Sequence, residues 1–399
     1  MKVLLSAYAC EPHKGSEPEV GWQRSLHMMA HAEEVWVLTR ANNRSVIEAD
    51  PLSCTPGLHF IYYDLPQWVL SLKKRVWFLP FYYLLWQLGA YRLAARHHRN
   101  RAFDSVYHVT LTSMLPGSFM GWLGIPFVIG PIAGGERAPL RLRRSMPIRS
   151  KSRELLRDFG ILFQLCSPLT HLTCAAAKHI HVTTPESLRL IPRRWHFKTS
   201  VQLAIASSGH VAGNDKCRRP DSPRFVFVGR LLFWKGLHFA IQALAKARTT
   251  NPAVTLTVIG SGPDERRLRE VAKRFGVADA VEFTGYLPRQ RLVDAFHSHS
   301  ALVFPSLHDS GGLVVLEALA EGLPVVCLDL GGPGIAVNAT CGIVVSTAHA
   351  TEAQIITNMA NAMVSVASMP VSESARLSAG AIARANELSW ARLTERIVG

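Results

Sequence analysis

The chain has 399 residues, of which 48% are hydrophobic, so it is long enough to bury two cores and too apolar to be disordered. Its 44 Lys and Arg against 29 Asp and Glu give a formal net charge of +15, which favours an anionic partner such as nucleic acid, a phospholipid surface or a phosphate-bearing substrate. Seven scattered cysteines without a C-x-x-C pair argue against a disulfide framework or a zinc site and fit a reducing compartment.

The N-terminal half alternates short apolar runs with helical segments. Nearly continuous apolar runs indicate parallel strands that are covered on both faces. The first run is too short for a signal peptide, and the longest uncharged apolar stretch, 76–91, is shorter than the roughly 20 residues of a spanning helix, so no transmembrane helix is predicted. The strands are predicted at 2–7, 35–39, 59–63, 105–109, 126–130 and 179–184, with a helix over 19–30.

The C-terminal half repeats this alternation after a polar stretch, 205–224, which is rich in Gly, Pro and Ser and is typical of a linker. Strands are predicted at 224–229, 255–260, 281–285, 301–305 and 324–328, with helices over 236–249 and 265–275. The pattern predicts an α/β protein with two doubly wound, Rossmann-like domains facing each other across a cleft. The predicted domains are 1–205 and 206–375, followed by a C-terminal helix over 376–399 that packs back toward the first domain.

The stretch F-V-G-R-L-L-F-W-K-G at 227–236 carries two cations in a strand-to-helix turn. The predicted strand ends at Gly229, and Arg230 and Lys235 follow it. Ligands of open parallel sheets bind at the carboxyl ends of strands, where helix N-termini also attract anions. The pattern therefore predicts a diphosphate site. The alternative is a solvated turn with two surface cations.

The stretch P-S-L-H-D-S-G-G-L-V-V-L-E at 305–317 follows another predicted strand. Asp309 lies in the loop and Glu317 about one turn into the next helix, so we expect both carboxylates at the mouth of the sheet. Gly311 and Gly312 let the backbone approach a ligand closely. Carboxylate oxygens suit vicinal hydroxyls because each accepts a separate hydrogen bond. We predict that Glu317 binds a ribose diol and Asp309 binds sugar hydroxyls; the alternative is a helix cap at Asp309 and a solvated Glu317.

Taken in order, four motifs of the chain resemble the retaining glycosyltransferases of family 4, which have the GT-B fold. The resemblance covers 224–345 closely and 1–200 more loosely. The motifs are F-V-G-R…K-G, V-I-G-S-G-P, F-T-G-Y-L-P and P-S-L-H-D-S-G-G-L-V-V-L-E-A-L-A-E-G-L-P-V-V.

The resemblance implies roles for the residues of these motifs. Arg230 and Lys235 would contact the donor diphosphate, and Glu317, the second acid of the family's E-x7-E motif, would bind the nucleotide ribose. Asp309 stands where the first acid is usually Glu, and Gly311 stands where Phe is common, which leaves the donor's identity open. The remaining residues assigned to substrate binding in these motifs are Gly260, Gly262, Ser310, Gly312, Leu313 and Val314.

The N-terminal half adds further matches to the family. The loop P-H-K-G-S-E-P-E-V-G-W resembles the family's loop that closes over the donor diphosphate, through Gly15 and Ser16. The alternative is a plain β–α turn, and the stretch lacks the G-x-G-x-x-G fingerprint of a nicotinamide site. His108 ends a predicted strand, where a similar His of related enzymes lies near the transferred sugar; the alternative is a satisfied core histidine. Glu136, after G-P-I-A-G-G, is assigned to the acceptor side.

Two H-x-H pairs, His179/His181 and His297/His299, place both rings on one face if they lie on strands, as a metal site requires. No further ligand types cluster near either pair in the sequence, so we interpret them as structural. We predict no metal and no cofactor, in line with the resemblance to GT-B enzymes.

The stretch 65–101 mixes aromatic residues with cations, and a second basic cluster spans 137–153. Apolar aromatics beside cations suit the interface of an anionic bilayer, although aromatics in a large chain usually form core. We expect a cytoplasmic enzyme, peripheral at the inner face of the membrane. Nucleic acid is not an expected partner, because no recognised binding motif accompanies the charge.

Together these features predict a retaining hexosyltransferase that uses a nucleotide-sugar, UDP- or GDP-linked, and a hydroxyl of a saccharide acceptor. We expect a lipid-linked acceptor and a role in cell-surface polysaccharide or glycolipid assembly. Two alternatives stay open. One is a GT-B nucleotide-sugar epimerase, and the other is a catalytically inactive scaffold of a polysaccharide assembly complex.

Overall fold

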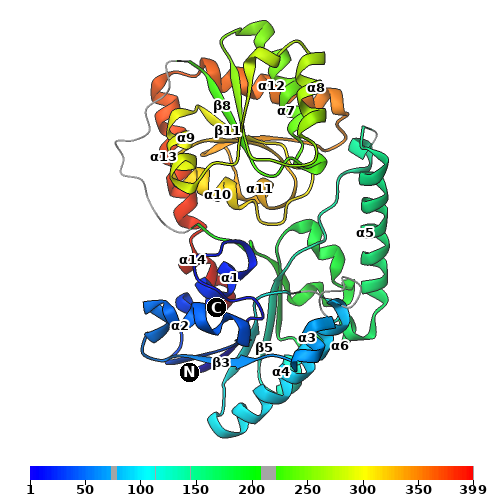
Figure 1. Cartoon of the computed structure of the whole chain (residues 1–399), viewed down its shortest axis with the longest axis vertical. Helices are drawn as coiled ribbons and strands as arrows, with labels where there is room; N and C mark the ends of the chain where they lie inside the picture. Colours follow the sequence, from blue (N-terminus) through cyan, green and yellow to red (C-terminus); the bar gives the residue numbers. More distant parts are fainter. Residues whose placement is uncertain (73–78, 113, 144, 208–221, 399) are drawn as a thin grey trace. The chain divides into compact units, whose positions relative to one another are not determined.

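The computed structural model describes residues 1–72, 79–112, 114–143, 145–207 and 222–398. The chain divides into two compact units, each with its own parallel sheet (Figure 1). The first unit comprises 1–135, 157–205 and 390–399, and the second comprises 136–156 and 206–389. Parts of the predicted linker (208–221) and of the aromatic stretch (73–78) lie outside the described residues.

Within its described residues, the first unit forms a seven-stranded parallel sheet in the order β3-β2-β1-β4-β5-β6-β7. The order reverses between β1 and β4, so the carboxyl ends of these strands form the switch point at which open sheets bind ligands. The sequence predicted every strand except the short β7. The strands are β1 (Lys2–Ser6), β2 (Glu34–Arg40), β3 (Leu58–Tyr63), β4 (Ser105–His108), β5 (Phe127–Ile132), β6 (His179–Val182) and β7 (Thr199–Val201).

Alternate residues of β1 reach different hydrophobic clusters on the two faces of this sheet. Val3 and Leu5 pack with residues of α1 and α14, whereas Leu4 packs with residues of α4 and α6. This period of two is what a strand buried on both faces requires. The helices of the first unit are α1 (Ser16–Met28), α2 (Arg44–Ala49), α3 (Gln67–Leu72), α4 (Leu79–Arg101), α6 (Pro168–Ala176) and α14 (Trp390–Val398).

The second unit has the same arrangement in a six-stranded parallel sheet of its described residues, in the order β10-β9-β8-β11-β12-β13. Its switch point lies between β8 and β11. The sequence missed only β13 here. The strands are β8 (Arg224–Val228), β9 (Thr255–Ile259), β10 (Val281–Gly285), β11 (Ala301–Phe304), β12 (Val325–Leu328) and β13 (Gly342–Val345).

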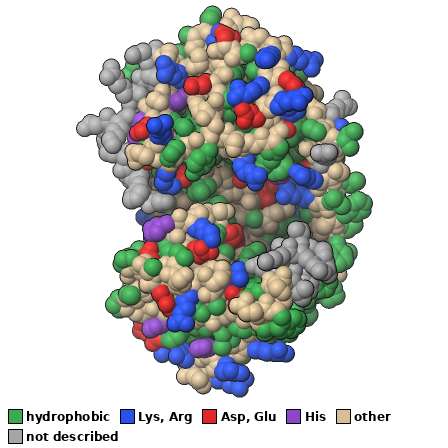
Figure 2. Space-filling view, in the orientation of Figure 1, with side chains coloured by type: hydrophobic (Ala, Val, Ile, Leu, Met, Phe, Trp, Pro, Cys, Tyr) green, Lys and Arg blue, Asp and Glu red, His purple; other side chains and the backbone are tan. Residues whose placement is uncertain are grey.

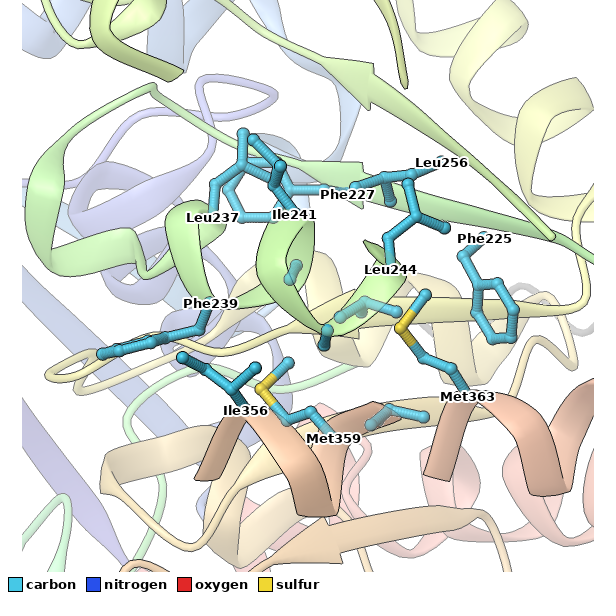
Figure 3. Packing of buried hydrophobic residues seen from close by; sticks show 14 of the residues in the cluster. Phe225, Phe227, Leu237, Phe239, Ile241, Leu244, Leu256, Ile356, Met359 and Met363 are labelled. Atoms are coloured by element: carbon cyan, nitrogen blue, oxygen red, sulfur yellow. The ribbon is translucent and has the colours of Figure 1, made fainter. Parts of the chain in front are cut away.

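Helices cover both faces of the second sheet, with α7, α8 and α12 on one side and α9, α10 and α11 on the other (Figure 1). Its core lies where α7 and α12 pack over β8 and β9, and Figure 3 shows residues of this cluster from all three parts, among them Phe227 of β8, Leu244 of α7 and Met359 of α12. The helices are α7 (Leu237–Thr250), α8 (Glu265–Arg274), α9 (Arg289–Ser298), α10 (Leu313–Ala320), α11 (Gly331–Ala336), α12 (Glu352–Ser368) and α13 (Val371–Glu387). The predicted α/β fold with two doubly wound sheets is confirmed.

The segment 136–156 differs from its predicted placement. The sequence assigned it to the N-terminal domain, but Ala138, Leu142 and Met146 are buried in the hydrophobic cluster of the second unit. The segment leads into α5 (Ile148–Cys166), and the division between the units falls within this helix. The basic segment thus carries a buried apolar residue at every fourth position, and these three residues attach it to the core of the second unit.

The C-terminal stretch, predicted as one helix, forms two. Helix α13 belongs to the second unit, and α14 belongs to the first, where it packs beside α1. The guanidinium of Arg24 in α1 donates to Thr394 Oγ1 at 3.2 Å and lies 5.5 Å from the centre of the Trp390 ring. Trp390 is thus a buried anchor of α14.

The aromatic stretch 65–101 is divided between core and surface. Tyr82 and Trp86 are fully buried on α4, whereas Trp68 and Phe81 are exposed. In the described parts of the chain, no single helix is long and apolar enough to cross a bilayer; one pair, Ser150–Cys166 with Pro168–Ala176, meets that length and composition only when taken together across a 61° bend.

Candidate functional site

The loop after β8 brings Lys235 to the switch point of the second sheet. Lys235 ends a short 3-10 turn, Phe233–Lys235. Its ammonium forms an ion pair with Asp309 and lies 5.1 Å from the centre of the Phe304 ring. Arg230, in the same loop, is exposed. Two cations therefore stand at the carboxyl end of β8, as the sequence predicted.

The loop after β11 is joined to the loop after β8. The Leu307 amide donates to the Trp234 carbonyl at 2.7 Å, and the Trp234 ring stacks on His308 at 5.4 Å between centroids. Gly236 has a φ of 73°, and a Cβ there would lie 1.9 Å from the Pro305 carbonyl oxygen. Only glycine allows this close approach. The two loops thus form one connected wall of the site.

Asp309 uses its two carboxylate oxygens differently. Oδ1 accepts a hydrogen bond from the Gly312 amide at 3.0 Å, just before α10 begins, and Oδ2 faces the Lys235 ammonium. The alternative was a helix cap at Asp309, but the N-cap of α10 is Gly312, which Asp309 bonds without occupying the N-cap itself. Asp309 thus stabilises the turn before α10 and contacts a cation. The predicted contact of Asp309 with sugar hydroxyls stays a prediction.

Glu317 lies in the second turn of α10 and is neither fully solvated nor alone. Its carboxylate accepts from Arg289 Nη1 at 3.1 Å. Burial raises the pKa of Glu317, and the positive charge and hydrogen bond of Arg289 work in the opposite direction. Next to it, a small hollow of about 30 Å³ lies between α9 and α10. Leu292, Phe296 and Leu313 supply apolar parts of its lining.

A buried ion-pair network supports these loops from below. Glu154 of α5 is 6% exposed and accepts from His308 Nε2 at 3.0 Å and from the Ala138 amide at 3.2 Å. It also forms an ion pair with Arg143, whose Nη2 lies 3.3 Å from the carboxylate. Burial would raise the pKa of Glu154, but the hydrogen bond and charge of His308, with Ala138 and Arg143, bring the pKa below its ordinary value. Because His308 precedes Asp309, this ionised carboxylate fixes the loop that presents Asp309.

The other residues predicted for the second unit lie around the same sheet edge. Gly260 and Gly262 belong to the loop after β9, whose Ser261 carbonyl accepts from the Leu231 amide at 3.0 Å, so this loop borders the loop of Arg230. Glu136 was predicted on the acceptor side, in the N-terminal domain; it is buried and belongs instead to the second unit, at the start of 136–156. Residues preceding or opening α10 are Ser310, Gly311, Gly312, Leu313 and Val314, of which both glycines are buried.

In the first unit, Gly15 and Ser16 lie where β1 leads into α1. Both have positive φ, 69° and 53°, and a Cβ at Gly15 would meet nothing within 4 Å. Glu17, the next residue, links this turn to the segment after β4. Its Oε1 accepts a hydrogen bond from the Leu111 amide at 2.6 Å. The predicted loop therefore stands at the switch point of the first sheet, with open space beside its glycine.

His108 ends β4 as predicted, but it is 1% exposed. Its Nδ1 is 2.9 Å from Ser118 Oγ, and its Nε2 is 3.4 Å from the hydroxyl of Tyr83. Burial lowers the pKa of His108 to about 4, so the imidazole is neutral near pH 7. These contacts match the satisfied core histidine that was the alternative. A role near the transferred sugar stays a prediction.

The two H-x-H pairs have ordinary protein partners. His179 and His181 both contact Ser200 Oγ, at 3.0 and 2.9 Å. His297 pairs with Glu321 at 2.9 Å, and His299 Nε2 is 3.0 Å from Thr257 Oγ1. Among the described residues, no group of three or more His, Cys, Asp and Glu side chains is placed to hold a metal ion.

Sequence reasoning missed three side chains that build the site of the second unit: Arg289, His308 and Glu154. His308 and Arg289 stand next to motif residues, in H-D-S-G-G and Y-L-P-R, and their positions after strands were a usable signal. Glu154 gave no such signal, because it lies about 150 residues from His308 in the sequence.

Comparison with known proteins finds a family match for part of the chain and a fold for the whole of it. Residues 214–362 match the family described as glycosyl transferases group 1. A glycogen synthase of Mycobacterium tuberculosis is 40% identical over 129 residues, which are 32% of this chain and 31% of the relative. A D-inositol 3-phosphate glycosyltransferase of Acidothermus cellulolyticus is 36% identical over 162 residues, 37% of this chain and 34% of the relative. The chain thus spans about a third of the length of these relatives.

Solved structures match the whole chain at low identity. The lipopolysaccharide outer core galactosyltransferase WaaB, in its apo form, aligns over 99% of this chain and 97% of its own, with a TM-score of 0.63 and 15% identity. Anabaena HepE in complex with UDP-glucose aligns over 100% of this chain and 98% of its own, with a TM-score of 0.60 and 15% identity. These likenesses show the fold, which is GT-B, as the sequence predicted.

Proposed function

We propose that the chain is a retaining glycosyltransferase that moves a hexose from a nucleotide-sugar to an acceptor hydroxyl, since residues 214–362 match the glycosyl transferases group 1 family. The observation that carries the proposal is the meeting of Lys235 and Asp309 at the switch point of the second sheet. Glu317 lies in α10, the helix that follows the loop of Asp309. A cation for the diphosphate and two carboxylates for sugar hydroxyls would therefore share one edge of the sheet.

The ion pair is compatible with diphosphate binding by Lys235. A lysine ammonium has three N–H donors and no acceptor, so Lys235 can donate to Asp309 and still donate to phosphate oxygens. Asp309 holds the flexible lysine side chain in place before the donor arrives, which lowers the entropy lost on binding. As the bond between sugar and diphosphate breaks, negative charge grows on the leaving oxygen, and Lys235 and Arg230 stabilise it.

Glu317 supplies the nucleoside end of the proposed site. Its carboxylate accepts two hydrogen bonds from a ribose diol, and apolar side chains of α9 and α10 beside it add contact area. Arg289 already occupies one oxygen of Glu317, at 3.1 Å. A ribose therefore shares the carboxylate with Arg289 or displaces its exposed side chain.

The donor and acceptor classes follow from chemistry and from proteins of the same fold. HepE was solved with UDP-glucose, so UDP-sugars come first among the donors to test, followed by GDP-sugars. WaaB is a lipopolysaccharide galactosyltransferase, and WaaG is a glycosyltransferase involved in lipopolysaccharide biosynthesis. They support a lipid-linked saccharide as acceptor and, for this chain, a cytoplasmic enzyme peripheral at the inner face of the membrane in glycolipid or cell-surface polysaccharide assembly.

The test is a thermal-shift screen of the purified chain against UDP- and GDP-sugars, followed by product analysis with and without saccharide acceptors. The proposal expects one donor class to raise the unfolding temperature and an acceptor-dependent product with retained anomeric configuration. A changed nucleotide-sugar without any acceptor would indicate an epimerase instead. The absence of transfer and hydrolysis with every donor that binds would favour the inactive scaffold.

A further inference from the structure

Helix α5 turns its largest apolar side chains away from the protein. Leu156, Phe159 and Phe163 are 70%, 61% and 67% exposed. At 3.6 residues per turn, the spacings of three, four and seven place such residues on one side of the helix. We name this side the outward face of α5; it consists of Ile148, Leu155, Leu156, Phe159, Leu162 and Phe163, all exposed.

The opposite side of α5 carries polar groups that face the protein. Glu154 is bonded to His308, and Gln164 donates to the Leu190 carbonyl at 3.2 Å. An ordinary surface helix has the reverse arrangement, with its apolar side on the core and its polar side in water. The outward face therefore contributes nothing to the core that the helix covers, and another apolar environment has to account for it.

Charge around the outward face has one sign. The exposed residues Lys151 and Arg153 lie at its borders, whereas the two acids of the helix, Glu154 and Asp158, are buried and half-buried. Figure 2 shows hydrophobic side chains gathered along α5. Exposed apolar side chains that gather in one patch, unlike single ones, mark interaction sites. An apolar strip with a cationic border is complementary to an anionic lipid surface, in which acyl chains lie below negatively charged headgroups.

We propose that the outward face of α5 docks the protein on an anionic lipid bilayer, with the helix lying in the plane of the headgroups. Docking in the plane follows from the contacts of its other side, because Glu154 and Gln164 keep that side bonded to protein. This inference goes beyond the proposed transferase activity and does not depend on it. Docking at this helix gives the enzyme access to acceptors held in the membrane.

Vesicle co-sedimentation of the full chain tests the proposal. Wild-type protein is mixed with vesicles of phosphatidylcholine alone and with vesicles that also contain phosphatidylglycerol, each at low and high salt. We expect binding that is stronger on the anionic vesicles and weakens with salt. The variant Phe159→Gln/Leu162→Gln/Phe163→Gln should lower the partition coefficient at least about tenfold, since each exposed apolar side chain contributes to insertion.

A matched variant, Val46→Gln/Leu52→Gln/Val371→Gln, removes three exposed apolar side chains outside α5. It should bind vesicles as the wild type does. Both variants should melt at the wild-type temperature, because none of the six positions is buried. Wild-type protein that stays in the supernatant with every vesicle overturns the proposal, as does equal binding by the α5 variant. If the wild type forms a dimer and binds no vesicles, and the α5 substitutions alone make it monomeric, the face belongs to a contact with a second copy. That outcome also overturns the lipid proposal.

Discussion

His108 ends β4 in the first unit, and Asp309 follows β11 in the second; both stand beside the switch point of a doubly wound sheet. The two positions have opposite environments. His108 is buried and neutral between Ser118 and Tyr83, whereas Asp309 is partly exposed and pairs with Lys235. The same strand topology therefore places a neutral, buried side chain at one strand end, His108, and a charged, partly exposed one at the other, Asp309.

The difference shows that a strand end at a switch point is not by itself a binding site; the neighbouring loops decide whether a site forms there. In the second unit, the loops after β8 and β11 contact each other and are backed by Glu154. In the first unit, the side chain at the end of β4 is absorbed into the packing of α4. Substitutions at the two strand ends should therefore have different effects.

The largest effect is expected for Lys235→Ala. Loss of the cation removes charge stabilisation of the leaving diphosphate, so kcat should fall about 100-fold or more, measured by steady-state transfer assays with the donor found in the screen. Lys246→Ala, which removes an exposed lysine of the same unit that donates to Thr357 Oγ1 at 2.8 Å, should keep wild-type activity. Wild-type turnover by Lys235→Ala would contradict the proposed role.

A smaller effect is expected for Glu154→Gln. The amide keeps the side chain's shape but removes the negative charge from the ion pair with the half-buried Arg143 and loosens His308, so the second unit should lose roughly 3 kcal/mol of unfolding free energy. Because Asp309 is then held less firmly, KM for the donor should rise about tenfold while kcat changes less. Urea unfolding and donor kinetics measure the two quantities. Glu270→Gln, in an exposed i,i+4 pair, is the matched control and should change neither.

A pH shift is expected for Arg289→Gln. Burial raises the pKa of Glu317 and Arg289 opposes this, so removing the guanidinium should raise the pKa further. A ribose diol needs the ionised carboxylate, and the acid limb of the kcat/KM profile should therefore move to higher pH. By the same sign, any stability linked to protonated Glu317 is lost as pH rises through its raised pKa. As a control, Arg291→Gln changes an exposed residue of α9 and should leave the pH profile unchanged. If the profile of Arg289→Gln does not shift, Glu317 does not take part in donor binding.

The smallest effect on activity is expected for His108→Gln, which sharpens the comparison from the first unit. The unfolded histidine takes up a proton near its ordinary pKa of 6.5, whereas the folded one does so only near pH 4. The neutral, buried His108 therefore contributes fully to the free energy of unfolding above pH 6.5. This contribution is lost as the pH falls toward 4, by roughly 1–3 kcal/mol. The variant should lose less stability over that range in urea unfolding. A large loss of transfer at pH 7 would instead support a role for His108 near the sugar.

Much of the fold was readable because parallel strands buried on both faces leave long apolar runs, such as F-V-F-V in β8. The short β7 was missed, since Thr199–Val201 carries too few apolar residues to stand out. Lys235, Asp309 and Glu317 were found because each follows a strand within a spaced motif. Glu154 and the packing of 136–156 were not, because ion pairs between distant segments depend on the finished tertiary structure and leave no periodicity.

The contact of Gly236 with the Pro305 carbonyl has a consequence for engineering donor preference. The backbone of one loop fills the space that a side chain on the other would need, and the Leu307–Trp234 hydrogen bond fixes their alignment. Grafting the segment after β8 from another transferase would therefore leave a mismatch at the segment after β11. A library that exchanges both segments as a matched pair, and leaves glycine at 236 constant, should yield more folded members than one that varies either alone.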